Sequence, residues 1–313
     1  MEMNQIEAFV MIAQVEGFSR AATMLHLSQP AISRRIGLLE EELGVTLFER
    51  MHGGALLTEA GRQFLPFARQ ILATVREGME AVRATERQAR GTIKLALVGT
   101  LAGTGLTARL LEFKKAFPQV RLSLRTARSN EVSAMVQSGE VHLGLRYFAD
   151  PHQEIISEPV GEESLIVVSS AQHVFEHGSP AGPTDLSGLP WVGFPEGQGS
   201  SGEPFTRVLF RQLTGAGLSE PEIIGIDSLS AQKRLIEAGF GIGLLPESSV
   251  QEELHLGTLA RLGIPEIETT VPVVVLYRKK GYLSKAARSL LGQLVHTGDQ
   301  TFDNPHHASN HQF

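Results

Sequence analysis

Three glycines in the stretch EGQGSSGEP (196–204) have the spacing of a dinucleotide-binding motif. Gly197, Gly199 and Gly202 form a G-x-G-x-x-G between a strand-like apolar segment and a helix-like one. In that motif the glycines bring the backbone close to a pyrophosphate at a helix N-terminus, and an acidic residue further along binds the ribose. A nucleotide-dependent enzyme, with Asp227 as this acid, is therefore one hypothesis.

The register of the motif argues against that hypothesis. Pro204 fits the first turn of the following helix, so all three glycines precede the helix, whereas the dinucleotide motif needs its last glycine inside it. The sequence also lacks a cysteine nucleophile, an H-E-x-x-H pair, a Walker lysine and a G-x-S-x-G elbow. We therefore expect no enzyme and no cofactor. Ser200, Ser201 and Gly202 are instead predicted to contact a small-molecule effector.

Gln29, Ser33 and Arg34 form a second group, on the outer face of a predicted helix. Gln and Arg offer bidentate hydrogen bonds to base edges, and the helix N-terminus favours phosphate. Ser28 is the expected N-cap, with Pro30 in the first turn. Apolar residues at helical spacing form the predicted buried stripe: Ile32, Ile36, Leu39 and Leu43.

Two shorter helices and a hairpin flank this helix. One amphipathic helix ends at Gly17, a second starts with Ser19 as its N-cap, and the pair Gly53–Gly54 predicts a small β-hairpin. Two helices joined by a tight turn, the second exposing Gln, Ser and Arg, form a candidate helix-turn-helix. Such patterns are unspecific, so a three-helix core without a DNA-binding role is the alternative.

A long helix is predicted from Glu59 to about Arg87, capped by Thr58. Apolar residues close to heptad spacing line it: Phe64, Ala68, Ile71, Val75, Met79 and Val82. Because no neighbouring segment offers a partner for this stripe, we predict dimerisation through residues 59–87. The alternative is that the stripe packs on the chain's own globular part.

After Gly91 the sequence alternates between strand and helix patterns, which is typical of a parallel sheet with crossovers and predicts two similar α/β lobes in tandem. The predicted strands are 92–98, 120–126, 141–146, 165–169, 191–194, 223–226, 241–245 and 269–277. The predicted helices are about 103–117, 129–138, 204–214, 229–238 and 284–295. The motif GFGIG (239–243) follows a helix and precedes a strand, which predicts a helix C-cap and a tight turn.

Ligands of two-lobed α/β proteins bind beyond the carboxyl ends of the parallel strands. This rule selects the segments that follow the predicted strands: Thr100, Leu101, Ser129, Asn130, Arg146–Phe148, Gly199–Gly202 and Asp227–Ser228. Hydroxyls and helix N–H groups hold anions, and Arg146 adds a positive charge, so we hypothesise a small carboxylate-bearing effector. Asp227 leaves alternatives open, because it could pair with Arg146 or select an amine.

Composition narrows the classes of function. With 313 residues and 42% hydrophobic residues, the chain predicts a globular protein of two or three domains. Zero cysteines exclude disulfides and thiolate metal sites, and the scattered histidines predict no metal site. The N-terminus MEMNQIEAF lacks a basic leader and a continuous apolar region, so we expect a cytoplasmic location and not a secreted solute-binding protein.

The charge distribution gives no general support for nucleic-acid binding. The net charge is −6, and residues 1–90 contain ten arginines against eleven glutamates. Any DNA binding must therefore depend on where the arginines lie. The acidic run Glu40–Glu42 is interpreted as a solvated face without a function.

Residues 3–62 closely resemble the N-terminal region of LysR-type transcriptional regulators. The matching segments are FSRAA, LSQPAISRRI, LEEELGVTLFER and LTEAG, in order and at the expected spacing. The segments AFPQVRLSL, SGEVHLGL and IEAGFGIGLLP are similar to parts of the family's effector domain. The resemblance therefore extends to about residue 295.

The resemblance implies an α/β protein with an N-terminal all-α winged helix-turn-helix, a long linker helix that dimerises, and two Rossmann-like lobes similar to those of periplasmic solute-binding proteins. The domains would be 1–58, 59–90 and 91–300, with one lobe at 91–161 and 268–295, the other at 162–267, and a disordered tail at 301–313. The implied function is a DNA-binding transcriptional regulator, commonly a homotetramer. Its partners would be double-stranded DNA and a small-molecule effector bound between the lobes.

The resemblance also implies site residues. The DNA-binding positions would be Ser19, Gln29, Pro30, Ser33, Arg34 and Arg50. Arg50 matches the wing arginine, and Ser19 would contact phosphate. Thr100, Ser129 and Arg146 match effector-contacting positions. For Arg35 and Arg62, DNA contact and a solvated surface position are equally open.

Overall fold

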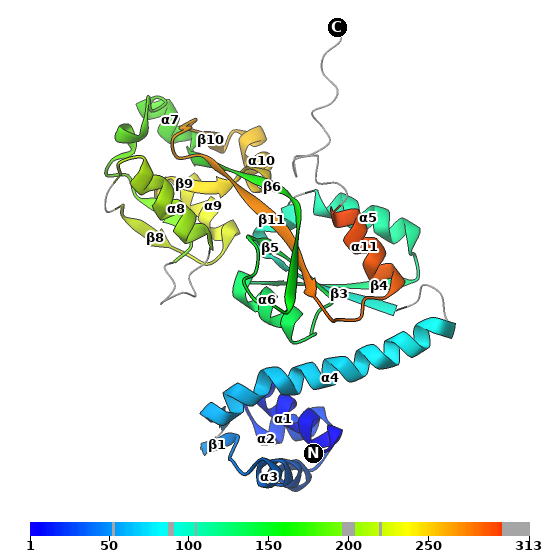
Figure 1. Cartoon of the computed structure of the whole chain (residues 1–313). Coiled ribbons are helices and arrows are strands. Elements are labelled where there is room, and N and C mark those ends of the chain that lie inside the picture. Colours follow the sequence, from blue (N-terminus) through cyan, green and yellow to red (C-terminus); the bar gives the residue numbers. More distant parts are fainter. Residues whose placement is uncertain (52–53, 87–90, 104, 196–203, 219–220, 296–313) are drawn as a thin grey trace. The chain divides into compact units, whose positions relative to one another are not determined.

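The computed structural model describes residues 1–51, 54–86, 91–103, 105–195, 204–218 and 221–295 (Figure 1). The chain divides into two compact units, and the first contains Met1–Gln88. Its elements are α1 (Met3–Val15), α2 (Phe18–Met24), α3 (Gln29–Leu43), β1 (Phe48–Met51), β2 (Gly54–Leu57) and α4 (Glu59–Glu86). No helix of the described residues is long and apolar enough to cross a membrane.

A small aromatic core joins the elements of the first unit. The ring of Phe9 on α1 lies 5.3 Å from that of Phe48 on β1 and 5.2 Å from that of Phe64 on α4. The strands β1 and β2 pair antiparallel, with Met51 opposite Gly54, which confirms the predicted hairpin. The hairpin and the start of α4 are therefore held on the three-helix core.

The helix α3 starts and ends at the residues that the sequence predicted. The hydroxyl of Ser28 accepts a hydrogen bond from Ala31 N (3.4 Å), and Gly44, with φ 71°, ends the helix. Ile32, Ile36 and Leu39 are buried as predicted, but Leu43 is exposed. The prediction was wrong for Leu43 because the helix ends there, beyond the neighbouring helices that cover the stripe.

The prediction of Ser19 as an N-cap was also wrong. The helix α2 begins at Phe18, and Gly17 is its N-cap, in extended backbone. Ser19 lies inside the first turn, where its carbonyl oxygen accepts a hydrogen bond from the Thr23 hydroxyl (3.1 Å). A glycine also tolerates the N-cap position, so the serine was not required there.

The 28-residue helix α4 has two different halves. Thr58 Oγ1 accepts a hydrogen bond from Gly61 N (3.0 Å), as expected for its cap. The first half of the stripe, Phe64, Ala68 and Ile71, packs on the core of the first unit. Further along, Val75, Met79 and Val82 are exposed. Within the first unit, the core therefore covers the first half of the stripe and leaves Val75 and Met79 exposed.

The second unit is built on a mixed seven-stranded sheet with the order β10-β6-β11-β5-β3-β4, in which β9 also pairs with β6. Its elements up to the middle of the unit are β3 (Gly91–Val98), η1 (Gly99–Gly103), α5 (Leu106–Ala116), β4 (Val120–Ala127), α6 (Ser129–Gln137), β5 (Leu143–Tyr147), β6 (Ile155–Ser170), α7 (Ala171–His177) and η2 (Pro183–Leu186). The remaining elements are β7 (Trp191–Gly193), α8 (Pro204–Gly215), β8 (Ile223–Gly225), α9 (Leu229–Glu237), β9 (Gly243–Pro246), α10 (Glu247–Leu256), β10 (Leu259–Arg261), β11 (Thr269–Arg278) and α11 (Lys285–Val295).

The predicted parallel core of the first lobe is confirmed. The strand β3 pairs in parallel with β4 on one side and with β5 on the other. In the second lobe β7 and β8 also pair in parallel. The carboxyl ends of β3, β4 and β5 therefore meet at one edge of the sheet, as the site prediction required.

The strand β6 is the main departure from the predicted elements. It has 16 residues, whereas the sequence predicted only 165–169 as strand. Its first part pairs with β11, and its last part pairs with β9 and β10. In Figure 1, β6 and β11 run side by side across the second unit. The helices α7 and α10 and the strand β10 were not predicted either.

The GFGIG segment forms a helix end and a tight turn, as predicted. Ala238 is the C-cap of α9, and Gly239 follows with φ 82°. Gly241 has φ 159°, and a Cβ there would lie 2.2 Å from the carbonyl oxygen of Pro190. Only glycine fits this close approach of two backbones.

Candidate functional site

The outer face of α3 presents polar side chains at the start of a capped helix. Gln29, Pro30 and Arg34 are exposed, and Ser33 is partly exposed. The opposite face is anchored in the core of the first unit. This arrangement leaves the N-terminal part of α3 accessible to a large partner, and the side chains on it can donate and accept hydrogen bonds.

Two further predicted DNA contacts lie nearby in the sequence. Ser19 has an exposed side chain in the first turn of α2. Arg50 belongs to β1, where it pairs with Ala55 of β2 in the hairpin, and its side chain lies outside the described residues.

Arg62 has a structural partner at each end of its guanidinium. Its Nε donates to Glu59 Oε2 (3.0 Å), and its Nη1 donates to the carbonyl oxygen of Leu57 (2.9 Å). Arg62 therefore ties the first turn of α4 to the end of β2. Arg35 is half-buried on α3.

The acidic run on α3 contains a residue with a role that the sequence interpretation missed. Glu40 Oε1 accepts hydrogen bonds from the backbone N–H groups of Leu47 (2.6 Å) and Phe48 (3.3 Å). These two residues begin the hairpin, so Glu40 fixes the hairpin to α3. The interpretation of Glu40 as a solvated residue without a function was therefore wrong.

The structure brings several of the predicted effector contacts to one edge of the sheet. Thr100 and Leu101 lie in η1 after β3, and Ser129 begins α6 after β4; all three are buried. Phe148 follows β5 in the left-handed region, with φ 61°, and its N–H donates to Pro272 O (3.0 Å). A bulky residue with positive φ is strained, so the chain path after β5 is held by its surroundings.

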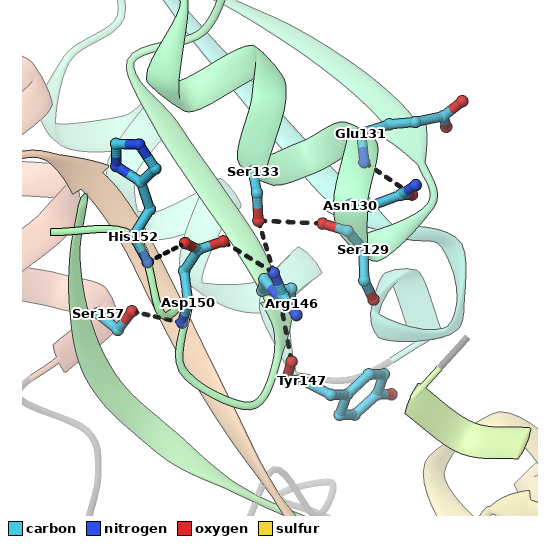
Figure 2. A network of polar contacts seen from close by, with 9 residues as sticks. All are labelled: Ser129, Asn130, Glu131, Ser133, Arg146, Tyr147, Asp150, His152 and Ser157. Carbon is cyan, nitrogen blue, oxygen red and sulfur yellow. Dashed lines mark hydrogen bonds and ion pairs between the residues drawn. The ribbon is translucent and has the colours of Figure 1, made fainter. Parts of the chain in front are cut away.

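Arg146 does not offer a free charge at this edge (Figure 2). Its Nη1 donates to Asp150 Oδ2 (3.0 Å) and to Ser133 Oγ (2.6 Å), and its Nε donates to the carbonyl oxygen of Tyr147 (3.1 Å). The side chains of Arg146 and Asp150 are only 11% and 6% exposed. Asp150 therefore compensates the guanidinium inside the protein.

Asp227 pairs with a different arginine from the one that the sequence suggested. Arg128 Nη2 lies 3.1 Å from Asp227 Oδ2, and these side chains are 60% and 64% exposed. The suggested pairing of Asp227 with Arg146 was therefore wrong. Arg128 precedes α6 and Asp227 follows β8, so the ion pair links the two predicted lobes.

Tyr147, which the sequence rule included without a role, faces the second lobe. Its ring lies 4.6 Å from the ring of Phe205 on α8, at 89°, in an edge-to-face arrangement. The side chains of Arg146 and Tyr147 point in different directions because neighbouring residues of a strand such as β5 lie on opposite faces of the sheet. A Cβ on Gly144, which shares the face of Arg146, would lie 2.8 Å from Val132 of α6. Arg146 therefore points toward α6, and Tyr147 points away from it.

A cavity of about 710 Å³ lies between η1 and the helices α9 and α10. Thr100 lines it, together with Ser230, Lys233, Ser248 and His255 among others. Lys233 is paired with Glu253 at 2.6 Å. Ser200, Ser201 and Gly202 lie outside the described residues.

Comparison with known proteins identifies the family. Residues 3–62 match the bacterial regulatory helix-turn-helix proteins of the lysR family, and residues 86–299 match the LysR substrate binding domain. The chain belongs to the LysR family. It is a DNA-binding transcriptional regulator with an effector-binding domain, and the hypothesis of a nucleotide-dependent enzyme was wrong.

Relatives of this LysR-type chain align over nearly its whole length. It is 28% identical over 294 residues to the HTH-type transcriptional regulator YofA of Bacillus subtilis, covering 94% of this chain and 98% of YofA. The crystal structure of CbnR, a LysR family transcriptional regulator, is 26% identical with a TM-score of 0.70, covering 96% of this chain and all of CbnR. Full-length CbnR complexed with its target DNA is also similar, at 26% identity and a TM-score of 0.68 over 95% of this chain and 100% of that one.

Proposed function

We propose that this regulator reads its operator with the exposed face of α3. Gln29, Ser33 and Arg34 would contact base edges, and Pro30 would pack beside them at the helix start. The observation that carries the proposal is that this polar face is exposed while the buried stripe anchors the other face. The similarity to CbnR, which has been crystallised with its target DNA, supports it.

We propose phosphate-contacting roles for two flanking residues. Ser19 would approach the DNA backbone from the first turn of α2, where the exposed N–H groups of the helix start favour an anion. Arg50 would contact the backbone or the minor groove from the hairpin, which Glu40 and Arg62 hold in place.

Footprinting of the DNA beside the protein's own gene tests the proposal. The expected result is a protected site at moderate salt, where phosphate-driven binding persists, with a protection pattern that changes when the correct metabolite is added. A chain that is folded but protects no DNA near its gene would contradict the proposal.

We further propose that the effector binds at the edge formed by η1, β5 and α6, facing the second lobe. A carboxylate on the effector stays our hypothesis, with Arg128 in place of Arg146 as its partner. Opening an exposed pair such as Arg128–Asp227 costs only about 0–1 kcal/mol, whereas Arg146 is held by a nearly buried carboxylate.

A thermal-shift screen of organic acids against the whole chain tests the carboxylate hypothesis. Stabilisation by carboxylates that is lost in Arg128→Gln would support it. Stabilisation by neutral or cationic compounds alone would contradict it.

We also propose a cytoplasmic homodimer formed through α4, assembled further into a homotetramer. The exposed apolar residues Val75 and Met79 support a dimer, because an exposed apolar stripe on a long helix favours a partner helix.

A further inference from the structure

Two buried hydroxyl groups at the proposed effector site have no hydrogen-bond partner among the described residues. They are Thr100 Oγ1 and Tyr147 Oη, on side chains of residues that are 3% and 0% exposed. The hydroxyls lie near one another, but not in hydrogen-bonding geometry. A buried hydroxyl without a partner is unfavourable, so both groups are expected to be satisfied by something that enters the site.

The sheet topology places both hydroxyls at one point between the lobes. Thr100 follows β3 and Tyr147 ends β5, and these two strands are parallel neighbours. The element η1 packs against α10, and the Tyr147 ring packs on Phe205 of α8. Thr100 also lines the cavity between η1, α9 and α10. The first lobe therefore contributes the two hydroxyls, and helices of the second lobe cover them.

A buried carboxylate lies close enough to Tyr147 to influence its hydroxyl group. Glu163 on β6 is 3% exposed and accepts hydrogen bonds from Ser248 N (3.2 Å) and Ser248 Oγ (2.9 Å) at the start of α10. Burial, and to a smaller extent the charge of Glu163, raise the pKa of Tyr147 far above its usual range. Tyr147 therefore keeps its proton and is a hydrogen-bond donor. An anion placed beside it would be repelled by Glu163.

We propose that Tyr147 and Thr100 form the floor of the effector site and select an effector by an uncharged oxygen atom, such as that of an amide, a ketone or a hydroxyl group. This oxygen accepts a hydrogen bond from Tyr147 Oη and interacts with the Thr100 hydroxyl. The inference rests on the proposed function, because it assigns a specificity residue within the same effector site. It concerns only the inner end of the effector, and Arg128 serves the outer end.

Fluorine NMR of the whole chain labelled with 3-fluorotyrosine tests the proposal. The chain has three tyrosines, so the three signals can be assigned by Tyr147→Phe, Tyr277→Phe and Tyr282→Phe. The probes are isobutyramide, isobutyrate and isobutylamine, which have similar shapes and are neutral, anionic and cationic. Isobutyramide is expected to shift the Tyr147 signal in a saturable way and to leave the other two signals unchanged.

Single-residue variants then test whether the hydroxyl groups of the floor contribute to the affinity for the probes. Thr100→Val, which keeps the shape and removes the hydroxyl, is expected to weaken isobutyramide binding about three- to tenfold, the cost of one hydrogen bond. Tyr277→Phe is the matched control, because it removes a hydroxyl that donates to Glu158 on β6, and it should leave the affinity unchanged. The three probes are compared in the Arg128→Gln, Asp227→Asn double variant, which removes the exposed charges at the outer end of the site. In that variant isobutyrate is expected to bind at least about tenfold more weakly than the amide.

Each contrary result overturns the proposal. A Tyr147 signal that isobutyramide does not move means that the hydroxyls are satisfied by a permanent buried water. In the double variant, tighter binding of isobutylamine than of the amide means that Glu163 selects a cation, and tighter binding of isobutyrate means that the floor accepts an anion. Equal affinity in Thr100→Val excludes Thr100 from the floor. The proposed DNA-binding function is tested by footprinting and not by these NMR measurements. A failure of that proposal can therefore be distinguished from a failure of the proposed effector floor.

Discussion

The two ion pairs of the effector-binding unit are chemically similar but differ in their surroundings. Arg146–Asp150 is nearly buried and Arg128–Asp227 is largely exposed. Removing one partner of a buried pair leaves an uncompensated charge, whereas an exposed charge is solvated by water. Neutralising the aspartate is therefore expected to lower the free energy of unfolding much more in the buried pair than in the exposed pair.

Asp150→Asn is expected to lower the free energy of unfolding by about 3–5 kcal/mol, because the nearly buried guanidinium of Arg146 then loses the negative charge of this carboxylate. Asp227→Asn is the matched control and is expected to change it by less than about 1 kcal/mol. Urea unfolding followed by circular dichroism measures both. Equal effects of the two substitutions would mean that Arg146 draws no stability from Asp150.

On α3, Ser33→Ala and Arg34→Ala are each expected to weaken specific DNA binding by about 1–3 kcal/mol, because each removes hydrogen bonds to the operator. Arg234→Ala, on the exposed surface of α9, is the control and should leave the affinity unchanged. Titration of a fluorescent operator measures the affinity, and analytical ultracentrifugation checks that the dimer persists. A dimer that is lost together with DNA binding would indicate a folding defect.

At the scale of elements, short sequence patterns predicted the helix ends and the hairpin turn, because neighbouring residues determine these features. Ser28, Pro30 and Gly44 mark both ends of α3, and Gly53–Gly54 mark the hairpin. The first half of β6 carries Pro159, Gly161 and several glutamates, so it does not look like a strand. It becomes one because β11, far away in the sequence, pairs with it, and this non-local pairing leaves no local pattern.

The edge of the sheet where we propose the effector site was predictable to the level of the segment and not of the side chain. The strand-end rule selected Thr100, Ser129 and residues 146–148 correctly as one edge. The strand-end rule and the family resemblance both selected Arg146, whereas the alternation of β5 gives the lobe-facing position to Tyr147. The link between Arg128 and Asp227 depends on how β4 and β8 are placed in space, which the sequence does not reveal.

The connection between α3 and the hairpin depends on one carboxylate. Glu40→Ala is expected to destabilise the protein by about 1.5–3 kcal/mol, because two backbone N–H groups lose a charged acceptor. Glu41→Ala, one position along on the exposed surface, is expected to change stability by less than about 0.5 kcal/mol. Thermal and urea unfolding measure the difference, and identical curves for the two variants would contradict the role of Glu40.

The two halves of α4 are expected to respond differently to a buried charge. Met79→Glu should raise the dissociation constant of the dimer more than about tenfold without lowering monomer stability, because Met79 is exposed within the chain. Ala68→Glu should unfold the first unit, because Ala68 is fully buried in its core. Sedimentation velocity and circular dichroism measure the two effects. A Met79→Glu dimer of unchanged affinity would place the dimer contact elsewhere.

For the whole molecule, the overall charge is a poor guide to function. A net charge of −6 accompanies a DNA-binding protein, and the proposed contact surface on α3 explains why the average charge need not be positive. The acidic residues near it have other tasks: Glu40 secures the hairpin and Glu59 holds Arg62.

The long strand β6 also affects how the second unit folds and how far it can be divided. Its two parts complete the sheet on both sides of the predicted lobe boundary, so a cut between residues 161 and 162 would sever a continuous strand and leave open edges on both fragments. Open edges pair with other chains, so separately expressed lobes are prone to aggregate. Pairing of β6 with the distant β11 also closes a long loop, which slows folding. We therefore expect the second unit to unfold in one cooperative transition, and its sheet to form only after β11 has been synthesised.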